Sequence, residues 1–158
     1  MPNSLKMKSI KFIIALLFTV HQISAQNAVL RQKHFNTEKN LAISGYDPVS
    51  YFSGKPLEGL KALSFTVDGI TYRFATAKNL ELFKKNPASY EPQYGGWCAY
   101  AMGSSGEKVE VDPETFKIIN GKLYLYYNKF FNNTLSSWNK NEAVLKAKAD
   151  ANWIKIYH

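Results

Sequence analysis

The sequence is poor in the residues that form disulfides and metal sites. Among 158 residues it has a single cysteine, Cys98. One cysteine cannot form a disulfide within the chain, so the fold must be stabilised by packing. Of its three histidines only His34 and His158 lie beyond residue 25, which excludes a histidine-rich zinc site. The thiol is therefore shielded, bound to a metal, paired between two chains or chemically active.

Long apolar runs are also missing. The main uncharged run covers residues 12–20, about half of the roughly twenty residues that a membrane-spanning helix needs. Three lysines precede this run, and the small residue Ala25 follows it, a pattern typical of a secretory signal peptide. We therefore predict a signal peptide over residues 1–25. The mature protein should be exported to the periplasm or the extracellular space and should not span a membrane.

Dense positive charge is absent, although the formal net charge is +8 at pH 7. Beyond the predicted signal peptide the lysines are interleaved with acids, whereas nucleic-acid binding needs a basic patch with stacking aromatics. The sequence has no phosphate-cradling glycine loop, nucleophile elbow or H-E-x-x-H motif. Nothing in it places His34 or His158 beside Cys98 as a catalytic base. We expect no nucleic-acid partner and no enzymatic activity.

Aromatic residues and hairpin turns are what the sequence does contain. Tyr, Phe and Trp make up 15% of the chain, which suits a densely packed core. Two pairs favoured in tight hairpin turns, Asp68-Gly69 and Asn120-Gly121, separate alternating apolar segments. Thr76 can cap a following helix. The pattern from Thr134 onward predicts an amphipathic C-terminal helix that is interrupted near residues 139–141.

These elements predict a small single α+β domain in which two β-hairpins pack against short helices and a C-terminal helix. We divide the remaining chain into an N-terminal arm, residues 26–40, and a domain, residues 41–158. The arm is polar and lacks a clear hydrophobic period, so we expect it to be extended or a loop. Asp47 and Asp112 each precede a proline, and we interpret both as caps of short helices rather than as catalytic acids.

The segment around Cys98 is the first candidate for chemistry. Gly95-Gly96 permits a left-handed backbone, and the small residues that follow can begin a helix with Cys98 in its first turn. The positive end of a helix dipole favours the thiolate, which is the form that binds soft metals. Met102 would lie on the same face of that helix, so both sulfur atoms could bind one soft ion such as Cu(I). The alternative is that both residues only pack in the core.

The second candidate site is an aromatic pocket for a small molecule or a partner segment. It would need no metal. The aromatic residues that we expect to line it are Tyr46, Tyr51, Tyr94, Trp97 and Tyr100.

Several longer motifs carry a resemblance to a known family. They are G-Y-D-P-V-S-Y-F at residues 45–52, D-G-I-T-Y-R-F-A at 68–75, F-K-K-N-P-A-S-Y at 83–90, Q-Y-G-G-W-C-A-Y at 93–100, N-G-K-L-Y-L-Y-Y-N at 120–128 and A-K-A-D-A-N-W at 147–153. Together they resemble a secreted YHS-domain protein over nearly the whole chain beyond residue 25. The resemblance implies a link to heavy-metal handling, because such domains occur beside copper and mercury transport modules.

The chain departs from the metal-binding pattern of that family. Cysteine-bearing members resemble D-P-V-C-G-M followed by F-C-S-x-x-C, and those cysteine positions here are Ser50, Ala75 and Asn79. The soft-metal cage is therefore missing, because these side chains do not replace thiolates. Two functions stay open, and a thiol redox enzyme is kept as a third. One is an exported protein that binds or handles a soft metal such as copper through the lone thiolate of Cys98. The other is a non-catalytic module that binds a ligand or partner in the aromatic pocket and needs no metal.

Overall fold

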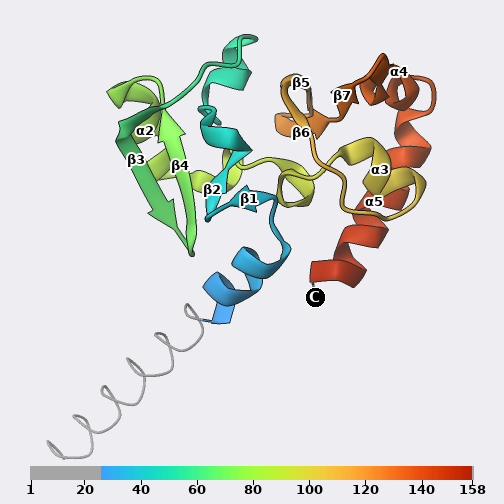
Figure 1. Cartoon of the computed structure of the whole chain (residues 1–158), viewed down its shortest axis with the longest axis horizontal. Coiled ribbons are helices and arrows are strands. Elements are labelled where there is room, and N and C mark those ends of the chain that lie inside the picture. The colour runs from blue at the N-terminus through green and yellow to red at the C-terminus, as the bar shows by residue number, and fades with distance from the viewer. Residues whose placement is uncertain (1–25, 158) are drawn as a thin grey trace, which may run out of the picture.

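The computed structural model describes residues 26–157, in which short strands and helices alternate (Figure 1). The strands are β1 Thr37–Glu38, β2 Leu41–Ala42, β3 Leu60–Val67, β4 Ile70–Phe74, β5 Asp112–Ile119, β6 Lys122–Tyr126, β7 Asn128–Lys129 and β8 Asn132–Asn133. The α-helices that follow β4 are α2 Ala77–Lys85, α3 Ala99–Ser104, α4 Thr134–Asn139 and α5 Glu142–Tyr157, and the short 3-10 helices are η1 Ile43–Gly45, η2 Ser50–Ser53, η3 Pro87–Ser89 and η4 Gln93–Gly96. The predicted α+β class is confirmed. The predicted signal peptide lies outside the described residues.

The first hairpin, β3-β4, forms at the predicted turn. Asp68 (φ 44°) and Gly69 (φ 78°) both adopt the left-handed conformation, as a two-residue type I′ turn requires. Val67 pairs with Ile70 across the turn. Because β4 also pairs in parallel with β2, the sheet has the order β1-β2-β4-β3.

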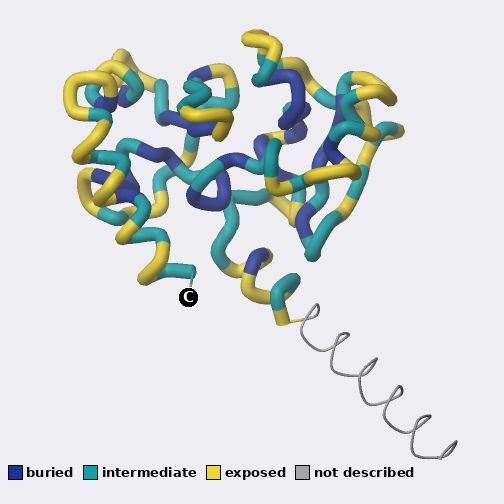
Figure 2. Tube along the Cα trace, turned by 180° about the vertical axis from the view of Figure 1, so that it is seen from behind, coloured by how far each residue is buried: buried dark blue, intermediate teal, exposed yellow. Residues whose placement is uncertain are grey.

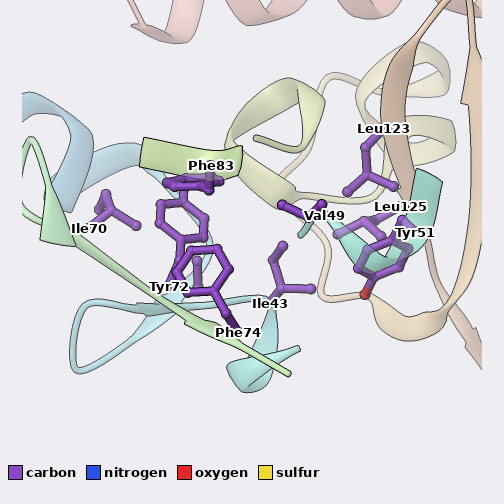
Figure 3. Packing of buried hydrophobic residues seen from close by; sticks show 10 residues of the cluster. Ile43, Val49, Tyr51, Ile70, Tyr72, Phe74, Phe83, Leu123 and Leu125 are labelled. Carbon is purple, nitrogen blue, oxygen red and sulfur yellow. The ribbon is translucent and has the colours of Figure 1, made fainter. Parts of the chain in front are cut away.

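The inner face of this sheet packs against α2 and forms the first core cluster (Figure 3). Phe83 of α2 lies against two buried residues of β4, with ring centroids 4.8 Å from Tyr72 and 5.1 Å from Phe74. Thr76 caps α2 as predicted, because its hydroxyl accepts a hydrogen bond from the backbone N–H of Asn79 at 3.1 Å. The buried members of the first core cluster are Ala42, Ile43, Val49, Tyr51, Ile70, Tyr72, Phe74, Phe83, Leu123 and Leu125.

The second hairpin, β5-β6, places one strand between two cores. Asn120-Gly121 forms its turn as predicted, with both residues at positive φ. Along β6, Leu123 and Leu125 join the first core cluster, while the alternate residues Tyr124 and Tyr126 join a second one. Burial on both faces of β6 ties the two clusters together, and Figure 2 shows buried segments in both halves of the molecule. The buried members of the second core cluster are Tyr94, Ala99, Met102, Tyr124, Tyr126, Trp138 and Ala149.

The C-terminal helices confirm the predicted interruption, since α4 ends at Asn139 and α5 begins at Glu142. α5 packs very closely against α3. A Cβ added at Gly103 would lie 2.4 Å from the carbonyl oxygen of Leu145, so only glycine fits this crossing. Within residues 26–157 no helix is both long and apolar enough to cross a membrane.

The prediction of an extended N-terminal arm was wrong, because residues 26–34 are helical. This N-terminal helix is held by polar contacts rather than by a regular apolar stripe. Arg31, which is 8% exposed, forms a two-pronged ion pair with Glu91, and its guanidinium carbon lies 4.4 Å from the ring centroid of Phe35. The Tyr72 hydroxyl donates to the same carboxylate at 2.9 Å. A hydrophobic period could not reveal a helix that is anchored in this way.

The prediction that Asp112 begins a helical turn was also wrong, because Asp112 is the first residue of β5. Its carboxylate accepts hydrogen bonds from the Glu114 N–H at 3.0 Å and the Thr115 hydroxyl at 2.9 Å. The register of β5 against β6 shifts between Asp112 and Phe116. The local hydrogen bonds that Asp-Pro favours are therefore formed, but they stabilise an irregular strand.

Candidate functional site

A run of left-handed residues places Cys98 at the start of α3. Tyr94 (φ 56°), Gly95 (φ 61°) and Gly96 (φ 86°) follow one another in this conformation. A Cβ at Gly95 would lie 2.9 Å from both the Phe35 and the Trp153 ring, so the turn depends on glycine. Cys98 is the N-cap residue of α3, next to the first-turn position that the sequence predicted.

The Cys98 sulfur is buried, yet it has polar neighbours. The residue is 0% exposed. Its Sγ accepts a hydrogen bond from the Tyr127 N–H at 3.4 Å and lies 3.4 Å from the Thr134 hydroxyl oxygen. That hydroxyl donates to the Tyr127 carbonyl at 2.9 Å, so its one proton is in use and its lone pairs face the sulfur. Thr134 can therefore accept a hydrogen bond from the Cys98 S–H group.

Both partners of the sulfur were missed by the sequence analysis. Tyr127 is 29 residues and Thr134 is 36 residues away from Cys98 along the chain. Tyr127 follows β6, and Thr134 is the first residue of α4. Neither belongs to a motif that would link it to the cysteine, because only the packing of α3 beside this hairpin brings the three residues together.

Cys98 contributes to the wall of a cavity of about 290 Å³, which we call the Cys98 pocket. Exposed polar residues, among them Glu107 and Asn132, form its rim, while Cys98 and Thr134 are buried at its base. The volume is close to the lower end of the range for small-molecule sites, roughly 300 Å³. The lining residues are Cys98, Tyr100, Ala101, Ser104, Ser105, Glu107, Val109, Tyr127, Asn132 and Thr134.

The predicted pair of metal ligands, Cys98 and Met102, does not face one cavity. Met102 is fully buried in the second core cluster and is not part of the Cys98 pocket. The carboxylate and hydroxyl oxygens in that pocket are hard donors, which suit a soft ion poorly. Among residues 26–157 no group of three or more His, Cys, Asp or Glu side chains could hold a metal ion.

His34 lies away from the thiol. Its backbone carbonyl accepts a hydrogen bond from the Trp97 indole at 2.7 Å, and its ring Nδ1 is 3.2 Å from the Lys108 ammonium. Partial desolvation, together with the positive charges of Lys108 and Lys33, lowers the pKa of His34. His34 is not among the residues lining the Cys98 pocket, so the structure brings no Cys-His pair together there.

The five aromatic residues predicted to share a pocket are divided between the two clusters. Tyr46 and Tyr51 pack with the first core cluster, and the Tyr51 hydroxyl donates to a backbone carbonyl at 2.7 Å. Tyr94, Trp97 and Tyr100 pack with the second core cluster. Of the five, only Tyr100 lines the Cys98 pocket. The structure therefore does not bring the five residues together around one pocket.

Asp47 forms a separate polar centre inside the protein. It is 0% exposed, and it caps the turn before η2 as predicted by accepting from the Val49 N–H at 2.8 Å and the Ser50 N–H at 3.3 Å. Its second oxygen accepts from the Ala75 N–H at 2.8 Å and the Asn79 side-chain amide at 2.7 Å. Four N–H donors occupy the lone pairs of both oxygens, so this carboxylate has no capacity left for a ligand.

The donors to Asp47 include the three positions that correspond to family cysteines in the resemblance, Ser50, Ala75 and Asn79. Two donate through the backbone and one through its side chain. Segments far apart in the sequence thus meet at the Asp47 carboxylate.

The Cys98 pocket is the cavity in which the thiol lies beside the Thr134 hydroxyl and below a polar rim. Comparison of the chain with protein-family models, with curated proteins and with solved structures finds no match.

Proposed function

We propose that this is an exported, non-catalytic binding module of the YHS-domain type, and that the Cys98 pocket is its ligand site. The single observation that carries the proposal is the cavity of about 290 Å³ above a buried thiol. The YHS-domain type is proposed from the sequence motifs alone. Export makes a further prediction, namely that the mature protein begins at Gln26, which mass spectrometry of the secreted chain would test.

The chemistry of the pocket defines the class of ligand. Its rim offers a carboxylate, hydroxyls and an amide, while its base is formed by aliphatic carbon and the buried Cys98. A small organic molecule with a polar end toward the rim and a compact apolar or sulfur-tolerant end toward Cys98 fits this distribution. The volume of the pocket suits a small molecule.

A second candidate, binding of a soft metal such as Cu(I), rests on the polar neighbours of the sulfur. The Tyr127 N–H already points at Sγ and would stabilise a thiolate once the S–H proton has left. Because Met102 does not line the Cys98 pocket, the remaining ligands would come from a molecule that brings the metal, and the buried Cys98 sulfur would have to become accessible to it. In this second candidate function, Cys98 would be the only metal ligand that the protein supplies.

A pocket-blocking variant tests the first candidate. A fragment library is screened by amide chemical shifts in ¹H-¹⁵N NMR spectra, with Cys98 and Tyr127 as reporters. Ser104 is on the exposed rim, so Ser104→Trp should abolish the shifts that fragments cause at these reporters. Ser136 is also exposed, on α4, but it does not line the pocket, so Ser136→Trp is the matched control. Fragments that bind Ser104→Trp as well as the wild type would contradict the proposal.

Copper titration against a competing Cu(I) chelator tests the second candidate. Cys98→Ser should abolish Cu(I) binding, whereas Met102→Leu should retain it because Met102 lies outside the pocket. Loss of Cu(I) binding in Met102→Leu would instead support the site predicted from the sequence, in which both Cys98 and Met102 bind the metal. If the wild-type protein does not compete with the chelator, the metal function is removed and the small-molecule function is unaffected.

A further inference from the structure

The outer face of the four-stranded sheet carries a cationic cavity that is separate from the Cys98 pocket. Along β4 the outward-facing residues are Thr71 and Arg73, and Ser64 of β3 pairs with Arg73 in the register. The cavity has a volume of about 440 Å³. We call it the Arg73 pocket, and its lining residues are Glu38, Lys39, Leu41, Lys61, Ser64, Thr71 and Arg73.

Arg73 is positioned by two glycines instead of by a carboxylate. A Cβ at Gly59 would lie 2.4 Å from the Arg73 carbonyl carbon, and a Cβ at Gly45 would lie 3.4 Å from Nη1 of its guanidinium. The two glycines are joined by a hydrogen bond from the Gly59 N–H to the Gly45 carbonyl at 2.9 Å. Gly59 therefore packs against the backbone of Arg73, and Gly45 packs against its guanidinium.

The cations of this pocket are not neutralised by the protein. Within residues 26–157, Arg73, Lys39 and Lys61 have no side-chain hydrogen bond and no ion pair. The other arginine in the sequence, Arg31, forms an ion pair with Glu91 through both of its terminal nitrogens. The one carboxylate in the lining, that of Glu38, leaves the pocket cationic overall.

We propose that the Arg73 pocket binds a phosphate group, either free or as a phosphomonoester. The planar guanidinium can donate two parallel hydrogen bonds to such an oxyanion, and the lysines supply point charges at the rim. The Thr66 and Thr71 hydroxyls lie 2.9 Å apart, and when Thr66 donates to Thr71, the proton of Thr71, which lines the pocket, is available to a ligand. Glu38 repels additional negative charge, which favours a compact anion over an extended polyanion.

The test titrates inorganic phosphate into the full-length protein and follows the amide signals of Ser64, Thr71 and Arg73 by NMR. We expect saturable shifts there, and about tenfold weaker binding in Arg73→Gln, because a charge-assisted bidentate contact is lost. Lys61→Gln, at an exposed rim position, should weaken binding as well without any effect on folding. Lys148→Gln is the control, since Lys148 is exposed on α5 outside the pocket.

A second arm identifies the source of the phosphate. Phosphatidylcholine vesicles with and without phosphatidic acid are added to the same variants. Arg73-dependent binding of free phosphate alone assigns a soluble ligand, and Arg73-dependent binding only to phosphatidic acid assigns a lipid headgroup. Either result supports phosphate binding in the Arg73 pocket. Equal binding by the wild type, Arg73→Gln and Lys61→Gln, or no binding of either probe, overturns it, and neither result bears on the Cys98 pocket.

Discussion

Removal of the Asp47 carboxylate should destabilise the protein more than any loss of a single hydrogen bond. Asp47→Ala leaves the N–H groups of Val49 and Ala75 and the Asn79 amide without their acceptor, at a site that is 0% exposed. Each unsatisfied buried donor costs about 1–3 kcal/mol. Part of this cost is recovered by relaxation or water entry, and we expect a total loss of about 4 kcal/mol. A typical domain has only about 5–15 kcal/mol of stability.

Two further variants separate the charge and the geometry of this centre. Asp47→Asn keeps the shape but turns an NH₂ group toward two N–H donors, so it should cost about 2–3 kcal/mol. Asn79→Ala removes one donor and leaves both oxygens partly bonded, which should cost about 1 kcal/mol. In the double variant Asp47→Ala/Asn79→Ala the two losses should not add, because the Asn79 amide has already lost its partner.

Urea unfolding followed by tryptophan fluorescence measures these differences. The signal is suitable because Trp138 is fully buried in the second core cluster, far from the altered residues in sequence. We expect the order Asp47→Ala, Asp47→Asn, Asn79→Ala from most to least destabilised. A loss below about 1 kcal/mol in Asp47→Ala would refute the reasoning that the four donors depend on this one carboxylate.

Two other predictions concern the C-terminal helices. Gly103→Ala should lower the free energy of unfolding by about 2–3 kcal/mol, because its Cβ would lie 2.4 Å from the Leu145 carbonyl oxygen, a backbone atom that cannot rotate away. Thermal unfolding measures the effect, with Ser104→Ala at the neighbouring exposed position as the control. Equal melting temperatures for the two variants would contradict the close crossing. A hydrogen bond from Lys117 lowers the pKa of Glu142 below its ordinary value of 4.5. The Glu142 carboxylate therefore contributes its full stabilisation above about pH 4.5. This stabilisation is lost as the pH falls through the lower pKa that Glu142 has in the folded protein. Urea unfolding between about pH 5 and pH 3 should show a smaller loss in Glu142→Gln than in the wild type. Parallel pH profiles would argue against the pairing.

Local features of the fold were predictable because local chemistry determines them. Asp68-Gly69 and Asn120-Gly121 tolerate the positive φ that a type I′ turn needs, so both hairpins could be located from two residues each. Thr76 and Asp47 have side-chain acceptors that suit the first N–H groups of a helical segment, and both accept these bonds. The fold class followed from the order of such elements.

The candidate site was less predictable because it depends on contacts across the chain. The spacing of Cys98 and Met102 suggested two ligands on one face, but packing against α5 places Met102 in the core. Tyr127 and Thr134 approach the sulfur only through the β6 and α4 connection. The Arg73 pocket was not predicted at all, because an arginine on a strand gives no sign of whether a carboxylate will face it in three dimensions.

The strand that is buried on both faces, β6, has a consequence for how the molecule can come apart. The leucines of β6 pack in the first core cluster and its tyrosines pack in the second. Removal of β6 would therefore expose both core clusters to solvent. Separate expression of the chain before and after residue 121 should therefore yield two unfolded fragments that regain structure only when mixed. An evolutionary change that replaces one half of this fold would therefore also have to replace β6, because β6 forms part of both core clusters.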